Sequence, residues 1–199
     1  WNNNAPKFED YVISYFTQHI ADSVESSVWS GTGATSGEFE GFLTATTGAF
    51  AVNGNVVANA AGGAYTATSI ISELQTIAAA IPSTVYGKED LRIYMNWKTY
   101  RFYISAISTL GYVNLYSMNN DYEAMFEGIK LAVVYGMPDN QMVAAQTSNL
   151  YFGTDLVSDT TQVKMLDMSP LDGSENLRFV AKFSGGVQVG IGADVVHQQ

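Results

Sequence analysis

A long amphipathic segment near the start of the chain constrains the fold more than any other feature of the sequence. Between Phe8 and Val28, apolar side chains recur at the 3.6-residue period of a helix, and Gln18 and Asp22 lie on the opposite side. Pro6 falls in the first turn, where a missing N–H costs nothing. The pattern predicts one long helix whose apolar face lies against another part of the protein.

The stretch that follows this helix, SGTGATSGEFEGFL, is rich in glycine and resembles a phosphate-binding loop only superficially. Gly31 and Gly33 follow a helix rather than a strand, and no Lys-Ser/Thr pair closes the motif. The run from Gly186 to Gly192 leads into no helix either. We expect Gly31 to end the helix as a left-handed cap and Gly41-Phe42-Leu43 to return the chain to the core.

The remaining elements run from helices to strands, which indicates an α+β fold with a mainly antiparallel sheet. A second helix ends at Pro82, and Asn96 caps a third helix that follows a short strand. A further short helix is possible at residues 121–127, and turns are expected at Asn53-Gly54 and Asp172-Gly173. The expected ranges are 70–81 and 97–108 for these helices, 91–95 for the early strand, and 129–136, 141–146, 149–156, 161–168, 176–185 and 186–196 for the later strands.

Composition excludes several functional classes. The chain has 199 residues, room for one large domain or two small ones, with 9 basic against 19 acidic residues and a net charge of -10, which disfavours specific nucleic-acid binding. It has no cysteine, so disulfide scaffolds and thiol chemistry are excluded. No apolar run is long enough for a membrane span. The hydrophobic share of 47% is ample for a core.

No constellation of side chains predicts catalysis, a cofactor or a metal. His19 is expected to pack at a helix edge and His197 to lie in a frayed tail, because neither has a ligand at helical spacing. The carboxylates of Asp121, Glu123 and Glu127 read as a solvated face, since a general acid needs a pocket that shifts its pKa. We therefore expect a protein that is not an enzyme.

An irregular, aromatic-rich segment between Gly111 and Phe126 is the main candidate for a contact surface. Aromatic and methionine side chains in such a segment are typical of protein interfaces but equally of a core, and the sequence alone does not decide between the two. The candidates are Tyr112, Leu115, Tyr116, Met118, Tyr122 and Phe126.

Read in order, these elements resemble the major capsid protein of tailed bacteriophages, the Hong Kong 97-type fold. The segment FEDYVISYFTQHIADSVESSVWSGTG resembles the spine helix of that family, and Gly41-Phe42-Leu43 its landing. Pro82 and the Met95-Asn96 step match a helix end and a strand-to-helix step of the family. The final segment, TQVKMLDMSPLDGSENLRFVAKFSGGVQVGIGADVV, resembles its closing hairpin. No single motif is diagnostic, but the signals occur in the right order over nearly the whole chain.

The resemblance implies a peripheral domain at residues 1–66 and 154–199, with the spine helix at 5–29, and an axial domain at 67–153. The family's N-terminal arm and extended loop have no counterpart here, so we expect the 199 residues alone to stay monomeric or weakly associated. The resemblance also implies that the 111–126 segment meets neighbours around five- and sixfold axes. The turn at residues 169–175, with Leu171, Asp172 and Glu175, would meet neighbours at threefold axes.

The implied function is a structural subunit of an icosahedral phage or prophage capsid that encloses double-stranded DNA. Its partners would be copies of itself, with scaffold, protease and portal proteins in the full-length context, and assembly would take place in the bacterial cytoplasm. An encapsulin-like nanocompartment shell is the alternative within the same fold. A β-rich surface adhesin is the alternative from another class.

Overall fold

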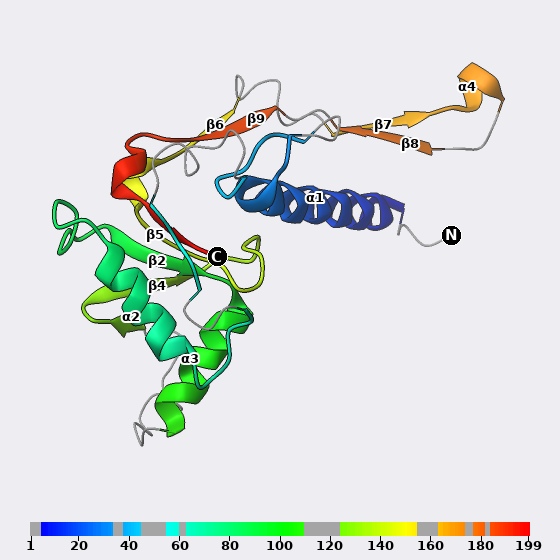
Figure 1. Cartoon of the computed structure of the whole chain (residues 1–199). Coiled ribbons are helices and arrows are strands. Elements are labelled where there is room, and N and C mark those ends of the chain that lie inside the picture. Colours follow the sequence, from blue (N-terminus) through cyan, green and yellow to red (C-terminus); the bar gives the residue numbers. More distant parts are fainter. Residues whose placement is uncertain are drawn as a thin grey trace.

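A six-stranded mixed sheet organises the described part of the protein (Figure 1). The computed structural model describes residues 5–33, 38–44, 55–59, 63–109, 124–154, 163–173, 177–181 and 184–199. The helices are α1 (Ala5–Ser30), α2 (Ile70–Ala80), α3 (Trp97–Thr109) and α4 (Ser169–Asp172). The strands are β1 (Val56–Val57), β2 (Leu91–Met95), β3 (Met125–Phe126), β4 (Ile129–Val133), β5 (Met142–Gln146), β6 (Leu150–Thr154), β7 (Val163–Asp167), β8 (Leu177–Ala181), β9 (Gly185–Val189) and β10 (Val196–Gln198).

The strand order in the large sheet is β1-β10-β5-β2-β4-β3. β2 and β4 are parallel, because the chain crosses between them through α3 rather than through a hairpin. β1 and β10 are also parallel, whereas the other neighbours in this sheet are antiparallel. β10 lies between β1 and β5, so the last described strand occupies an interior position of the sheet.

Both faces of the sheet are covered by apolar side chains, because successive residues of a strand point to opposite sides. In β2, Leu91, Ile93 and Met95 belong to a cluster built with α2 and α3, which cover one face (Figure 1). Tyr94 belongs to a second cluster on the other face, which includes Trp29 of α1. The sheet is therefore the centre of the described core.

Two narrow antiparallel ribbons extend from this core. β6 pairs with β9, and β7 pairs with β8. α4 lies at the far end of the β7–β8 ribbon, remote from the six-stranded sheet (Figure 1). Gly173 closes α4 with a φ of 71°, a left-handed conformation that suits glycine.

The structure confirms the α+β class, the three longer helices and the early strand, and it corrects one local prediction. Residues 124–127 do not continue a helix, because β3 pairs with β4 and a tight turn with a positive φ at Glu127 and Gly128 joins them. Residues 121–123 of that expected helix, and the expected turn at Asn53-Gly54, lie outside the described residues. The large sheet is mixed, although antiparallel pairs predominate in the described strands.

Candidate functional site

The C-terminal end of α1 joins the helix to the sheet. Trp29 is buried there, and its ring centroid lies 5.5 Å from that of Phe42 and 5.5 Å from that of Tyr94 in β2. Tilted aromatic pairs at this separation add to the free energy gained from burial alone. Trp29 therefore anchors one end of the helix on the face of the sheet opposite to α2 and α3.

The segment after the helix returns and caps its final carbonyl groups. The N–H of Phe42 donates to the carbonyl of Val28 at 2.9 Å, and the N–H of Leu43 donates to that of Trp29 at 2.8 Å. Carbonyl groups at a helix end lack an intrahelical partner, so these bonds satisfy carbonyl groups that would otherwise be buried without a hydrogen bond. Phe42 and Leu43 are themselves buried, which confirms the predicted return to the core.

Glycine is required in this segment by close packing. Gly31 does not adopt a left-handed conformation, so its prediction as a left-handed cap is wrong; Gly33, with a φ of 66°, does. A Cβ at Gly31 would overlap the carbonyl oxygen of Phe39 and lie 2.5 Å from that of Ser27. The contact with Phe39 comes from the returning segment, and no local pattern around Gly31 could have shown it.

The loop between β4 and β5 provides a second anchor for α1. The N–H of Tyr135 donates to the carboxylate of Glu25 at 2.9 Å. Gly136 lies directly against the backbone of Glu25, where any Cβ would overlap its carbonyl oxygen. α1 is therefore held at Glu25 as well as at Trp29, both in its C-terminal half.

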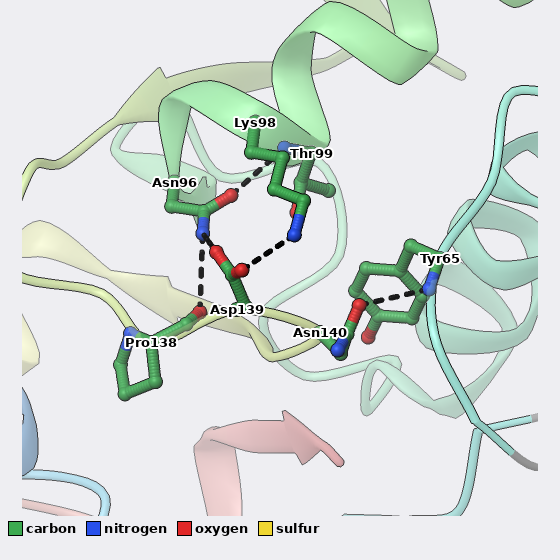
Figure 2. Close-up of polar contacts among 7 residues, drawn as sticks. All are labelled: Tyr65, Asn96, Lys98, Thr99, Pro138, Asp139 and Asn140. Carbon is green, nitrogen blue, oxygen red and sulfur yellow. Dashed lines mark hydrogen bonds and ion pairs between the residues drawn. The ribbon is translucent and has the colours of Figure 1, made fainter.

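The same loop also holds the start of α3 (Figure 2). The side chain of Asn96 accepts a bond from the Thr99 N–H at 2.8 Å, as a helix N-cap, and donates to Asp139 at 2.6 Å. Lys98 forms an ion pair with Asp139 at 2.6 Å, and its hydrogen bond holds the pKa of Asp139 below the usual value. The neighbouring Asn140 accepts a bond from the Tyr65 N–H at 2.9 Å. Residues 135–140 thus tie three distant segments together.

The apolar stripe of α1 is exposed over residues 11–16, where its side chains are described. Tyr11 is 66% exposed and Tyr15 53% exposed, and Ile13 and Phe16 are also open to solvent. The expectation that this face lies against another part of the protein is wrong for these described residues, although it is confirmed at the other end of the helix, where Val28 packs against the second cluster. The rings of Tyr15 and His19 lie 4.5 Å apart, so His19 packs beside this stripe on the helix surface.

Further large apolar side chains are exposed on the two ribbons and in the loops that follow β4 and β9. Tyr151 and Phe152 are successive residues of β6, so they lie on opposite faces of a ribbon only two strands wide. Exposed aromatic side chains are enriched at protein contact surfaces. These exposed positions, which the sequence did not predict, are Tyr135, Tyr151, Phe152, Leu166 and Ile191. For α1, the continuous apolar stripe was a sequence signal of a contact surface.

The contact residues predicted from the sequence fall in three places. Phe126 lies in β3, half-buried, with its ring centroid 6.3 Å from that of Tyr103 in α3. The backbone of Leu171 and Asp172 lies in α4, at the far end of the β7–β8 ribbon (Figure 1). Their role in subunit contacts stays a prediction. Tyr112, Leu115, Tyr116, Met118, Tyr122 and Glu175 lie outside the described residues.

Two further titratable groups among the described residues, His197 and Asp90, have shifted pKa values. His197 is 2% exposed in β10, so its prediction as part of a frayed tail is wrong, and burial lowers its pKa to about 4. Hydrogen bonds from Ser148 and Gln146 lower the pKa of Asp90 to about 2 and join the start of β2 to the end of β5. Within the described residues no three His, Asp or Glu side chains group as metal ligands, and no helix has the length and hydropathy of a membrane span.

Comparison with known proteins places this geometry among shell proteins. No family model and no curated protein sequence matches the chain. Solved structures match over 94–96% of it: the capsid of an empty GTA particle (16% identity, TM-score 0.64), the procapsid of satellite phage P4 (10%, 0.62) and the holo-SrpI encapsulin complex of Synechococcus elongatus (12%, 0.59). The chain has the fold of phage capsid proteins.

The chain covers 65%, 63% and 63% of the lengths of these three structures, respectively. A match to a Mycobacterium phage Che8 structure covers 76% of the chain and 55% of that structure, at a TM-score of 0.55. The TM-scores of 0.55–0.64 establish the fold, whereas identities of 10–16% establish nothing beyond it.

Proposed function

We propose that the protein is a structural subunit of an icosahedral phage or prophage capsid, which acts by assembling with copies of itself around double-stranded DNA. The observation that carries the proposal is the capsid fold over nearly the whole chain, together with apolar surfaces that the described part of the chain leaves open. A net charge of -10 suits a shell that encloses DNA without binding it tightly.

Within this proposal the fold is of the Hong Kong 97 type, and α1 is the spine helix. The peripheral domain comprises residues 1–66 and 154–199, and the axial domain residues 67–153. The position of α4 at the end of a projecting ribbon supports a role for residues 169–175 in contacts between subunits. The exposed face of α1 and the β6–β9 ribbon add candidate contact surfaces.

Direct evidence for the proposal would come from electron microscopy of the full-length gene product, expressed with any protease encoded beside it. Closed shells are the expected result. Monomer alone at high concentration, by sedimentation, would contradict it.

The exposed stripe of α1 offers a test of the surface itself. A Tyr15→Glu/Phe16→Glu double variant should fold normally and lose assembly, because it places two charges in an apolar contact. Gln18→Glu, on the side of the same helix opposite to the apolar stripe, is the matched control and should still assemble. Normal shells formed by the double variant would show that this face of α1 is not part of the contact surface.

A nanocompartment shell is the second candidate, supported by the likeness to the encapsulin complex of Synechococcus elongatus. Neighbouring genes separate the two functions. A portal and a prohead protease would favour a capsid, and a cargo enzyme beside the gene would favour a nanocompartment.

A further inference from the structure

An exposed face with two aromatic rings and one cation lies at the start of α3. Trp97 is 53% exposed, although tryptophan is highly buried on average in folded proteins. Its ring stacks on that of Tyr100 at a centroid separation of 5.5 Å. Arg101 follows Trp97 by one helical turn, so it lies on the same side of the helix, and it is exposed. Trp, Tyr and Arg are the residues most enriched among those that dominate binding at protein interfaces.

The opposite side of α3 packs against its own chain. Tyr103 and Ala106 are buried there, in the cluster that α3 shares with α2 and the sheet. In the part of the chain that the structure describes, no carboxylate forms an ion pair with Arg101. Trp97 and Arg101 therefore offer an apolar ring and a positive charge to a partner outside the chain.

A hollow of about 710 Å³ opens between the C-terminal end of α2 and the turn that joins β3 to β4. The hydroxyl of Tyr86 donates to the carbonyl of Glu127 at 3.5 Å, so these two residues meet at its edge. The side chain of Glu127 is exposed, and no described residue forms an ion pair with its carboxylate. Residues that line the hollow include Ala78, Ala79, Ile81, Tyr86 and Glu127.

The face of α3 and the hollow are complementary in shape and in charge. The alanine, isoleucine and tyrosine side chains of the hollow suit an aromatic ring such as that of Trp97. The carboxylate of Glu127 suits the guanidinium of Arg101, because an Arg–carboxylate pair can form two parallel hydrogen bonds. A second copy of this chain therefore supplies the matching partner for each of the two surfaces.

The two surfaces cannot meet within one copy. β2 and β4 are parallel, and Trp97 follows the end of β2 whereas Glu127 precedes the start of β4. The two residues thus lie at opposite ends of this strand pair (Figure 1). Five residues of extended strand separate these ends, which is roughly 16 Å. A contact between two different surfaces of neighbouring copies is heterologous, and such contacts generate rings or filaments.

We propose that Trp97 of one copy inserts into the hollow of the next copy and that Arg101 pairs with Glu127 across this head-to-tail contact. The inference deepens the proposed function and rests on it, because rings of copies within a shell require a heterologous contact. A single ring in a single hollow buries less than the roughly 1,200 Å² of a stable interface. The contact therefore adds to others in the shell and does not hold two copies together alone.

Exchange of the two charges tests the contact in the full-length product. Arg101→Glu and Glu127→Arg should each raise the protein concentration needed for shells by about tenfold or more, because each places like charges opposite each other. The double variant Arg101→Glu/Glu127→Arg should assemble as the wild type does. Both side chains are exposed, so the Tm of each unassembled variant should stay unchanged.

Truncation of the aromatic ring tests the hollow separately. Trp97→Ala should also raise the concentration needed for shells by about tenfold or more. Lys98→Ala is the matched control at the next position of α3, where the side chain is exposed and pairs with Asp139 of its own chain. This control should assemble normally.

The outcomes separate this contact from the proposed function. Shells formed at the wild-type concentration by Arg101→Glu and Trp97→Ala, or no recovery in the charge-exchanged double variant, would overturn the contact and leave the proposed function intact. A wild-type product that forms no shells would overturn both. Normal shells that lack packaged DNA would instead assign this face of α3 to nucleic acid, whose bases stack on aromatic rings.

Discussion

The six-stranded sheet and the β6–β9 ribbon differ in how far their apolar side chains are buried. In β2, residues on both faces of the strand are buried under α2, α3 and the end of α1. In β6, Tyr151 and Phe152 point to opposite faces and both remain exposed. The sheet holds the main core of the described residues, whereas β6 presents two aromatic side chains that the described residues leave exposed. The two regions should therefore respond differently to mutation.

The largest expected difference is between truncations in the two regions. Leu74→Ala, at a fully buried position of α2, should lower the free energy of unfolding by about 2–5 kcal/mol, through lost burial and the cavity that remains. Phe152→Ala, at a half-exposed position of β6, should cost less than about 1 kcal/mol in the unassembled chain. Urea unfolding measures both, and equal losses would contradict the contrast.

The pH dependence of stability probes the sheet through His197. Its pKa is about 4 in the folded chain against about 6.5 when unfolded, so between these values the unfolded chain binds more protons. The contribution is complete above pH 6.5 and is lost as the pH falls toward 4, by about 3 kcal/mol in total.

Urea unfolding at several pH values between 7 and 4 measures this slope. His197→Gln should flatten it. A slope that His197→Gln does not alter would exclude His197 as its source.

The joint between α1 and the sheet tests whether close backbone contact is essential. Gly41→Ala places a Cβ 2.6 Å from the Ser27 oxygen and 2.7 Å from the Gly31 nitrogen, so it should cost about 1–3 kcal/mol. Gly186→Ala in β9 meets no atom within 4 Å and is the matched control. Comparable unfolding midpoints for the two variants would show that the segment at Gly41 can move away from the end of α1 without loss of stability.

The smallest of these effects on the single chain should come from the loop network. Asn96→Ala removes the N-cap of α3 and one bond to Asp139, and should cost about 1–2 kcal/mol. Lys98→Ala removes only the exposed ion pair and should cost less than about 1 kcal/mol. Thermal unfolding of both variants checks this ranking, which would fail if Lys98→Ala were the more damaging.

The sequence predicted those features that depend on neighbouring residues. Leu91–Met95 and the cap at Asn96 follow from alternation and local hydrogen bonding, and both are present. The burial of His197 was missed, because it depends on the insertion of β10 between two strands distant in sequence. Gly31 was misread for the same reason, since Phe39 rather than its own φ requires the glycine.

For the candidate site, the capsid resemblance predicted the fold, but the contact residues stay predictions. Periodicity identified the apolar stripe of α1 correctly and could not show that its N-terminal half would be left open. Whether an apolar stripe packs against its own chain or against another molecule depends on where the helix lies in the tertiary structure. The sequence of the helix alone does not determine that position.

The interior position of β10 has a consequence for synthesis on the ribosome. β5 is complete at residue 146, yet its edge facing β10 cannot be paired until residues 196–198 have emerged some fifty residues later. At roughly 5–20 residues per second, a nascent chain carries that open strand edge for several seconds. Such an edge is a template for pairing with other chains. Slower translation would lengthen that interval.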